Sequence, residues 1–128
     1  MKLQLLLKQF ISYSTVGFFS IAIDAVLYII LSDLFSVSKS LSKIISFIAG
    51  SVNSFIGNKI FTFRIKSFNL NEPVKFFIVY SISLMFNSLT HDFFLEIYDG
   101  VLPFLISTIV SVIINFFGQK LWVFNSKK

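Results

Sequence analysis

Four long apolar runs, separated by short polar breaks, make up most of the chain. They cover residues 10–31, 41–61, 74–94 and 102–121, and each has about the 20 residues that a helix needs to cross a bilayer. Inside a bilayer the backbone must satisfy its hydrogen bonds within its own segment, so such runs predict helices. We therefore expect an all-α integral membrane protein with four transmembrane helices.

The polar breaks group these helices in pairs. The clearest break, residues 69–73, falls in the middle of the chain, and shorter breaks at 36–40 and 99–100 divide each half. This pattern predicts a single membrane domain over the whole chain, built from two helical hairpins, 8–66 and 74–124.

The two hairpins end in the same motif. Residues 53–63, NSFIGNKIFTF, are matched by residues 114–124, INFFGQKLWVF, so that both carry a Gly, an amide, a Lys and then an aromatic. The second helices align at an offset of 61 residues and the first helices at 67, which places Asp24 on His91. An internal repeat of this kind indicates two copies of one unit.

The first ten residues carry an amphipathic pattern with two interpretations. Their apolar face is formed by Leu3, Leu6, Leu7 and Phe10. They form either a short helix on the membrane surface or the first turns of the first spanning helix. A cleaved signal peptide is not expected, because Lys8 interrupts the apolar run and no small-residue cleavage site follows.

Composition and charge placement fit a membrane protein of fixed orientation. The chain is 55% hydrophobic and only 13% charged, with a mean hydropathy of +0.85 and a net charge of +5. Nine of the eleven Lys and Arg residues lie near the termini or the middle linker. The positive-inside rule then places both termini and the middle linker in the cytoplasm. Both hairpins would run in the same direction, as parallel rather than inverted repeats.

The residue inventory argues against catalysis. There is no Cys and a single His, which leaves no thiolate or His-based metal site. Phosphate-binding loops, nucleophile elbows and zinc-protease motifs are also missing from the sequence. We expect no enzyme activity, no cofactor, no metal and no nucleic-acid partner.

Two ionisable residues in or near the spans are candidates for a transport pathway. Asp24 lies well inside the first apolar run, where a charge is costly and usually faces a cavity or a partner. It is either a proton acceptor or gate group, or a helix-end acid paired with a hydroxyl or with His91. His91 is either a second titrating group or an interfacial residue beside Asp92.

The paired motif predicts a phosphate site. Lys59 and Lys120, with the amides around them, would bind a phosphate entering from the cytoplasmic leaflet, since Lys is a point-charge phosphate ligand. The alternative is that both lysines only anchor the helix ends at lipid phosphates. Phe61 and Trp122 suit the aromatic belt at the interface. The predicted head-group ligands are Asn53, Asn58, Lys59, Asn115, Gln119 and Lys120.

The chain resembles the GtrA-like family over residues 8–124. The resemblance is carried by residues 8–17 (KQFISYSTVG), 57–63 (GNKIFTF) and 118–124 (GQKLWVF). It implies a small four-helix membrane protein of a bacterium or archaeon, linked to cell-surface polysaccharide synthesis, O-antigen glucosylation or teichoic acid glycosylation. By position it implicates Asn58, Lys59, Phe61, Gln119, Lys120 and Trp122. Many relatives have Asn where this chain has Gln119, which changes the reach of that amide.

The resemblance implies that the protein flips a polyprenyl-phosphate-linked monosaccharide from the cytoplasmic to the outer leaflet of a prokaryotic inner membrane. Its expected partners are that sugar lipid, membrane lipid, a membrane glycosyltransferase and further copies of itself. One alternative is an assembly partner that stabilises a glycosyltransferase without transport. Another is a small multidrug-type proton-coupled exporter with Asp24 as its acid, although the strong Lys and Arg asymmetry argues against it.

Overall fold

The protein is entirely helical over the residues that its computed structural model describes, 2–125. Several α-helices continue into a single π-helical turn, written η. The elements in chain order are α1 (Lys2–Ile29), η1 (Ile30–Leu34), α2 (Lys39–Gly57), η2 (Asn58–Thr62), α3 (Asn71–Leu95), α4 (Leu102–Gly118) and η3 (Gln119–Val123).

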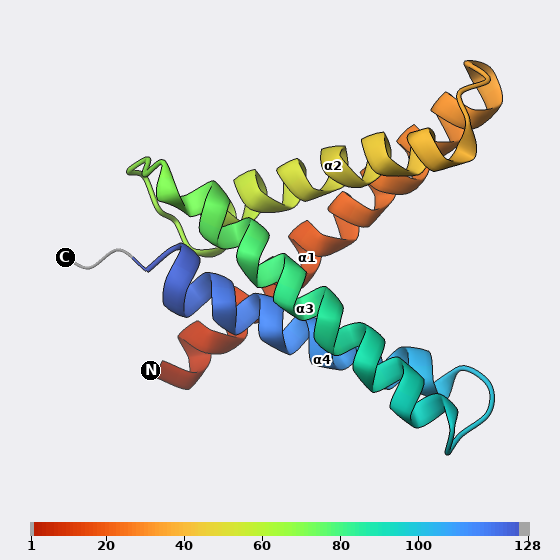
Figure 1. Ribbon diagram of the computed structural model, residues 1–128. Helices are drawn as coiled ribbons and strands as arrows, with labels where there is room; N and C mark the ends of the chain where they lie inside the picture. The colour runs from red at the N-terminus through yellow and green to blue at the C-terminus, as the bar shows by residue number, and fades with distance from the viewer. Residues whose placement is uncertain (1, 126–128) are drawn as a thin grey trace. The chain divides into compact units, whose positions relative to one another are not determined.

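These elements form two compact units, Met1–Lys66 and Ser67–Lys128, which we call the first and second hairpins. In Figure 1, α1 runs beside α2 in the first hairpin and α3 runs beside α4 in the second.

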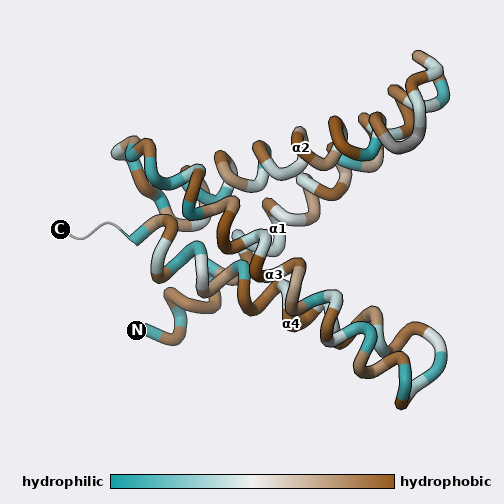
Figure 2. The backbone as a smooth tube through the Cα atoms, in the orientation of Figure 1, coloured by the Kyte–Doolittle hydropathy of each residue, from teal (hydrophilic) through white to brown (hydrophobic). Residues whose placement is uncertain are grey.

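The predicted all-α fold with four spans is confirmed. The helices long and apolar enough to cross a membrane cover Lys2–Leu34, Leu41–Thr62, Asn71–Leu95 and Leu102–Val123 among the described residues. Apolar residues predominate along them (Figure 2), and many large apolar side chains are exposed on each helix. Such a surface suits contact with lipid, because lipid hydrocarbon chains are as apolar as these side chains.

The N-terminal residues are the first turns of α1. This helix is continuous from Lys2, so the amphipathic pattern of the first ten residues does not form a separate surface helix. Of the two interpretations of that pattern, the structure supports the second.

Small residues bring α1 and α2 close together in the first hairpin. A Cβ atom added at Gly50 would lie 2.8 Å from the backbone oxygen of Ser20, and one at Gly57 would lie 2.7 Å from Cγ1 of Val16. Small residues at such contacts let transmembrane helices approach closely. Close approach is what allows short polar side chains to bond across this interface.

The second hairpin has one such close contact at a glycine. A Cβ atom at Gly118 would lie 2.6 Å from Cγ1 of Val79. Further along the interface, the Ser83 hydroxyl donates to the backbone oxygen of Ser111 over 3.2 Å. Phe116 fills the interior and is almost fully buried.

Burial in the two hairpins corrects the alignment of their first helices. The buried residues Tyr13, Val16 and Ser20 of α1 correspond to Phe76, Val79 and Ser83 of α3, an offset of 63 rather than 67 residues. Val16 and Val79 each contact the Gly of the motif, which supports the same offset. The error is four residues, about one helical turn, and a one-turn shift keeps the same face inward. Asn87, rather than His91, is therefore the counterpart of Asp24.

We predict that Gly50→Ala destabilises the first hairpin. The new methyl group would meet backbone that cannot rotate away, and overpacking of this kind costs about 1–3 kcal/mol. The measurement is thermal unfolding in detergent followed by circular dichroism, with a lower midpoint expected.

Gly17→Ala is the matched control, since a Cβ atom at Gly17 of α1 has nothing within 4 Å. Ala favours a helix over Gly by about 1 kcal/mol, so this variant should keep or raise the midpoint. Equal behaviour of the two variants would contradict close packing at Gly50.

Candidate functional site

A row of polar contacts joins α1 to α2 and η2 in the first hairpin. At one end, the hydroxyls of Ser12 and Thr62 lie 3.1 Å apart. In the middle, Nδ2 of Asn53 donates to Oγ of Ser20 over 2.9 Å. Toward the connection between the helices, Ser46 bonds to Asp24. Polar groups therefore follow one another along most of this interface.

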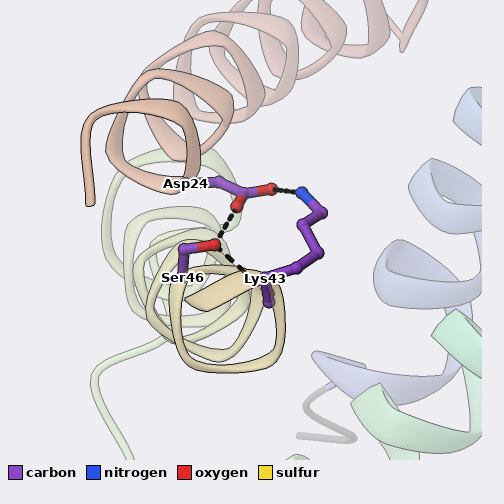
Figure 3. Close-up of polar contacts among 3 residues, drawn as sticks. All are labelled: Asp24, Lys43 and Ser46. Carbon is purple, nitrogen blue, oxygen red and sulfur yellow. Dashed lines mark hydrogen bonds and ion pairs between the residues drawn. The ribbon is translucent and has the colours of Figure 1, made fainter. Parts of the chain in front are cut away.

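Asp24 binds two residues of α2 at once. Nζ of Lys43 lies 2.7 Å from Oδ2 of Asp24, and Oγ of Ser46 donates to Oδ1 over 2.6 Å. Figure 3 shows the Lys43 side chain curving back to the carboxylate, so that the two partners approach different oxygens. The Ser46 hydroxyl is also 3.2 Å from the backbone oxygen of Lys43. We call these three residues the charged cluster.

The charged cluster holds an ion pair within a spanning segment. A single charge there would be costly, and a partner charge offsets much of that cost. The two side chains differ in exposure: that of Asp24 is 19% exposed, whereas that of Lys43 is 58% exposed. The Lys43 side chain is therefore the more accessible member of the pair.

Lys43 is a partner of Asp24 that the sequence did not predict. The predicted partners were a hydroxyl or His91, and the hydroxyl is present as that of Ser46. The sequence could have indicated Lys43, because Asp24 and Lys43 lie on either side of the short connection between two antiparallel helices. At the offsets that the structure supports, Asn87 and Phe104 take these places in the second hairpin, so the pair has no counterpart there.

A recess lies at the surface of the first hairpin between its two ends. Its volume is about 450 Å³, and it combines hydroxyl and amide groups with aromatic and aliphatic ones. Its lining residues are Ser12, Thr15, Val16, Phe19, Asn53, Gly57 and Phe61. The predicted head-group residue Asn53 thus borders an accessible space while it bonds to Ser20.

Both predicted lysines lie on π-helical turns. The Phe63 N–H donates to the backbone oxygen of Asn58 and the Phe124 N–H to that of Gln119, each over 2.8 Å, which closes η2 and η3. Lys59 and Lys120 follow these two amides directly. The two lysines lie on different hairpins, and a joint phosphate site stays a prediction.

The amides of the motif are interior residues. Asn58 and Gln119 are fully buried. Nδ2 of Asn58 donates to Oγ of Ser54 over 3.3 Å, and its Oδ1 accepts from Thr62 over 3.0 Å. Asn58 therefore stabilises the turn that carries Lys59. In the second hairpin, Oδ1 of Asn115 is buried with no hydrogen-bond partner among the described residues.

The remaining predicted residues are at the surface. His91 is half-buried, and its Nδ1 lies 3.5 Å from Oδ1 of its neighbour Asp92. Phe61 and Trp122 are exposed. Trp122 also contacts Lys75 of α3, whose ammonium group lies 5.6 Å from the ring centroid.

Comparison with known proteins gives one family. A family model described as GtrA/DPMS, transmembrane domain, matches residues 12–124. No significant match to a curated protein or to a solved structure was found. The matched domain is typical of membrane proteins in glycosylation-related processes that use polyprenyl-phosphate sugars.

We predict that Asp24 and Lys43 are energetically coupled. Asp24→Asn or Lys43→Gln alone would leave one charge without its partner, whereas the double variant removes both charges. The coupling energy from the double-mutant cycle should be about 0.5–3 kcal/mol, as for residues in direct contact. The measurement is chemical unfolding in detergent for all four proteins.

Asp33→Asn is the matched control. Asp33 is exposed, and its Oδ1 accepts a hydrogen bond from the hydroxyl of its neighbour Ser32 over 3.0 Å. Combined with Lys43→Gln, it should show additive effects. Additivity of Asp24→Asn with Lys43→Gln would contradict the ion pair.

Proposed function

Because the chain belongs to the GtrA/DPMS transmembrane-domain family, we propose that it flips a polyprenyl-phosphate-linked monosaccharide across the membrane. The movement would run from the cytoplasmic to the outer leaflet of a prokaryotic inner membrane. The product would supply sugar for cell-surface polysaccharide, O-antigen or teichoic acid glycosylation. The protein would act without catalysis and without a cofactor.

The row of polar groups along α2 carries this proposal. Counted from Thr62, Asn53 lies about 14 Å along the helix and Ser46 about 24 Å, at 1.5 Å per residue. These distances compare with a hydrocarbon thickness of about 30 Å. A sugar phosphate cannot leave water for hydrocarbon without partners for its polar groups. The α1–α2 interface offers hydroxyl, amide and charged groups at successive depths.

The recess beside Asn53 supports the same function. It presents polar groups from Ser12, Thr15 and Asn53 next to the rings of Phe19 and Phe61. A lipid-linked head group needs such a mixed surface, since its sugar requires hydrogen bonds while its prenyl chain stays in lipid. We assign this recess to the passage of the head group.

Lys59 and Lys120 would attract the phosphate at the cytoplasmic end. Lys59 is buried, with 9% of its surface exposed, and Lys120 is half-buried. With Asn58 and Gln119 buried beneath them, the lysines supply the charge and the amides hold the turns. Asn115 would add a hydrogen-bonding group nearby in the second hairpin.

The charged cluster would act later on the path. Lys43 can offer its ammonium group to the phosphate while Asp24 keeps its bond to Ser46. Asp24 is then a group that changes partner as the substrate passes. His91 is proposed to belong to the path only as a surface residue. Further copies of the chain and a membrane glycosyltransferase are the proposed protein partners.

We predict that Lys59→Ala combined with Lys120→Ala slows translocation at least tenfold. A charge-assisted hydrogen bond contributes about 1.5–3 kcal/mol, and about 1.4 kcal/mol corresponds to a factor of ten. The measurement is the appearance of a polyprenyl-phosphate sugar in the outer leaflet of proteoliposomes, detected with an impermeant probe.

Lys8→Ala combined with Lys66→Ala is the matched control, because both side chains are exposed and the same charge is removed. It should retain the wild-type rate. If the wild type itself is no faster than empty liposomes, the flippase proposal fails. A pull-down of the glycosyltransferase that depends on Lys59 and Lys120 would then favour an assembly partner.

A further inference from the structure

The second hairpin contains a polar pocket that the paired motif does not explain. Its volume is about 560 Å³, within the range of about 300–1,000 Å³ that is typical of small-molecule sites. It lies where the first turns of α3 face η3 and the residues that follow. The polar and aromatic residues of its lining include Asn69, Glu72, Lys75, Trp122 and Asn125. We call this space the Trp122 pocket.

An aromatic ring in contact with a lysine borders the pocket. The ammonium group of Lys75 lies 5.6 Å from the centroid of the Trp122 ring, a distance that gives cation–π attraction. Trp122 keeps 44% of its surface exposed, so a ligand can still contact it. Glu72 is only 6% exposed and places a carboxylate beside the pocket. Asn69 shapes the entry of α3, because its Oδ1 accepts from the N–H of Asn71 over 3.0 Å.

The first hairpin does not share this chemistry. At the offsets supported by burial, Ser12 and Phe61 correspond to Lys75 and Trp122. Ser12 bonds to Thr62 and, being uncharged, cannot make a cation–π contact with the Phe61 ring. The lysine and the indole are therefore features of the second hairpin alone, and the common helical scaffold does not require them.

We infer that the Trp122 pocket binds the hexopyranosyl phosphate head group of the lipid-linked sugar. Sugar hydroxyls can donate hydrogen bonds to the carboxylate and amide oxygens of the lining, whereas a fully ionised bare phosphate has no such donors. The C–H face of a pyranose ring packs well on an indole. Lys75 supplies the positive charge for the phosphate. This inference rests on the proposed function and names where the sugar is recognised.

Trp122 makes the inference directly testable, because it is the single Trp of the chain. Its fluorescence would be titrated in nanodiscs with farnesyl phosphate and with its glucose-, galactose- and mannose-linked forms. We expect at least one hexose form to change the emission and to bind at least tenfold more tightly than farnesyl phosphate. Phosphatidylglycerol is titrated in parallel to identify a site for ordinary lipid head groups.

Variants then distinguish recognition of the sugar from recognition of the phosphate. Glu72→Gln should reduce the preference for the hexose form about tenfold while binding of farnesyl phosphate is retained. Lys75→Met should weaken both ligands. Glu96→Gln, an exposed acid at the other end of α3, is the matched control and should change neither. Should Glu72→Gln fail to fold, Asn125→Ala at the exposed rim of the pocket replaces it, with the same loss of preference.

The outcomes are distinct from those of the translocation assay. Equal affinity for farnesyl phosphate and all three hexose forms overturns the inference, as does an equal response to phosphatidylglycerol or no response at all. Hexose-selective binding without translocation would leave the sugar pocket in place and remove the flippase function. Translocation without hexose-selective binding would leave the flippase function in place and remove the sugar pocket.

Discussion

A polar group inside a bilayer must find its partner within the protein, and the first hairpin depends on this constraint. Its polar side chains are short, so they can bond across the interface only where the helices almost touch. Gly50 provides that approach, since its Cα faces the backbone of Ser20 and the Cβ of Asp24. The close contact therefore also sets the position of the charged cluster. The same residues therefore determine both the helix packing and the position of the candidate transport path.

The two hairpins share a scaffold and differ in their charges. Both place a valine against the Gly of the motif and both end in a π-helical turn. In the first hairpin the charged pair is Asp24 with Lys43, toward the connection between the helices. In the second it is Lys75 with the Trp122 ring, at the opposite end. The two hairpins thus differ in which residues carry their charged contacts and in the end of the hairpin at which those contacts lie.

The sequence predicted the features that depend on composition and missed those that depend on contact. Long apolar runs were sufficient for all four helices, because a span is defined by length and hydropathy. The offset between first helices was wrong by one turn, since a one-turn shift leaves the inward face unchanged. Lys43 and Lys75 were missed because each acquires its role from a residue on another helix. The burial of Asn58 likewise follows from packing, which the motif spacing does not encode.

Under the proposed function, the charged cluster has to pass an anion on rather than retain it, and its balanced charge suits that task. Under the proposed orientation, Lys59 and Lys120 provide positive charge where the phosphate enters. An unpaired lysine deep in the path would hold the phosphate too tightly, since charge interactions are strong where water is scarce. Asp24 lies 2.7 Å from the Lys43 ammonium group and balances its charge. In the proposed transport, the head group would meet a partner that exchanges without retaining it, which would favour release at the outer leaflet.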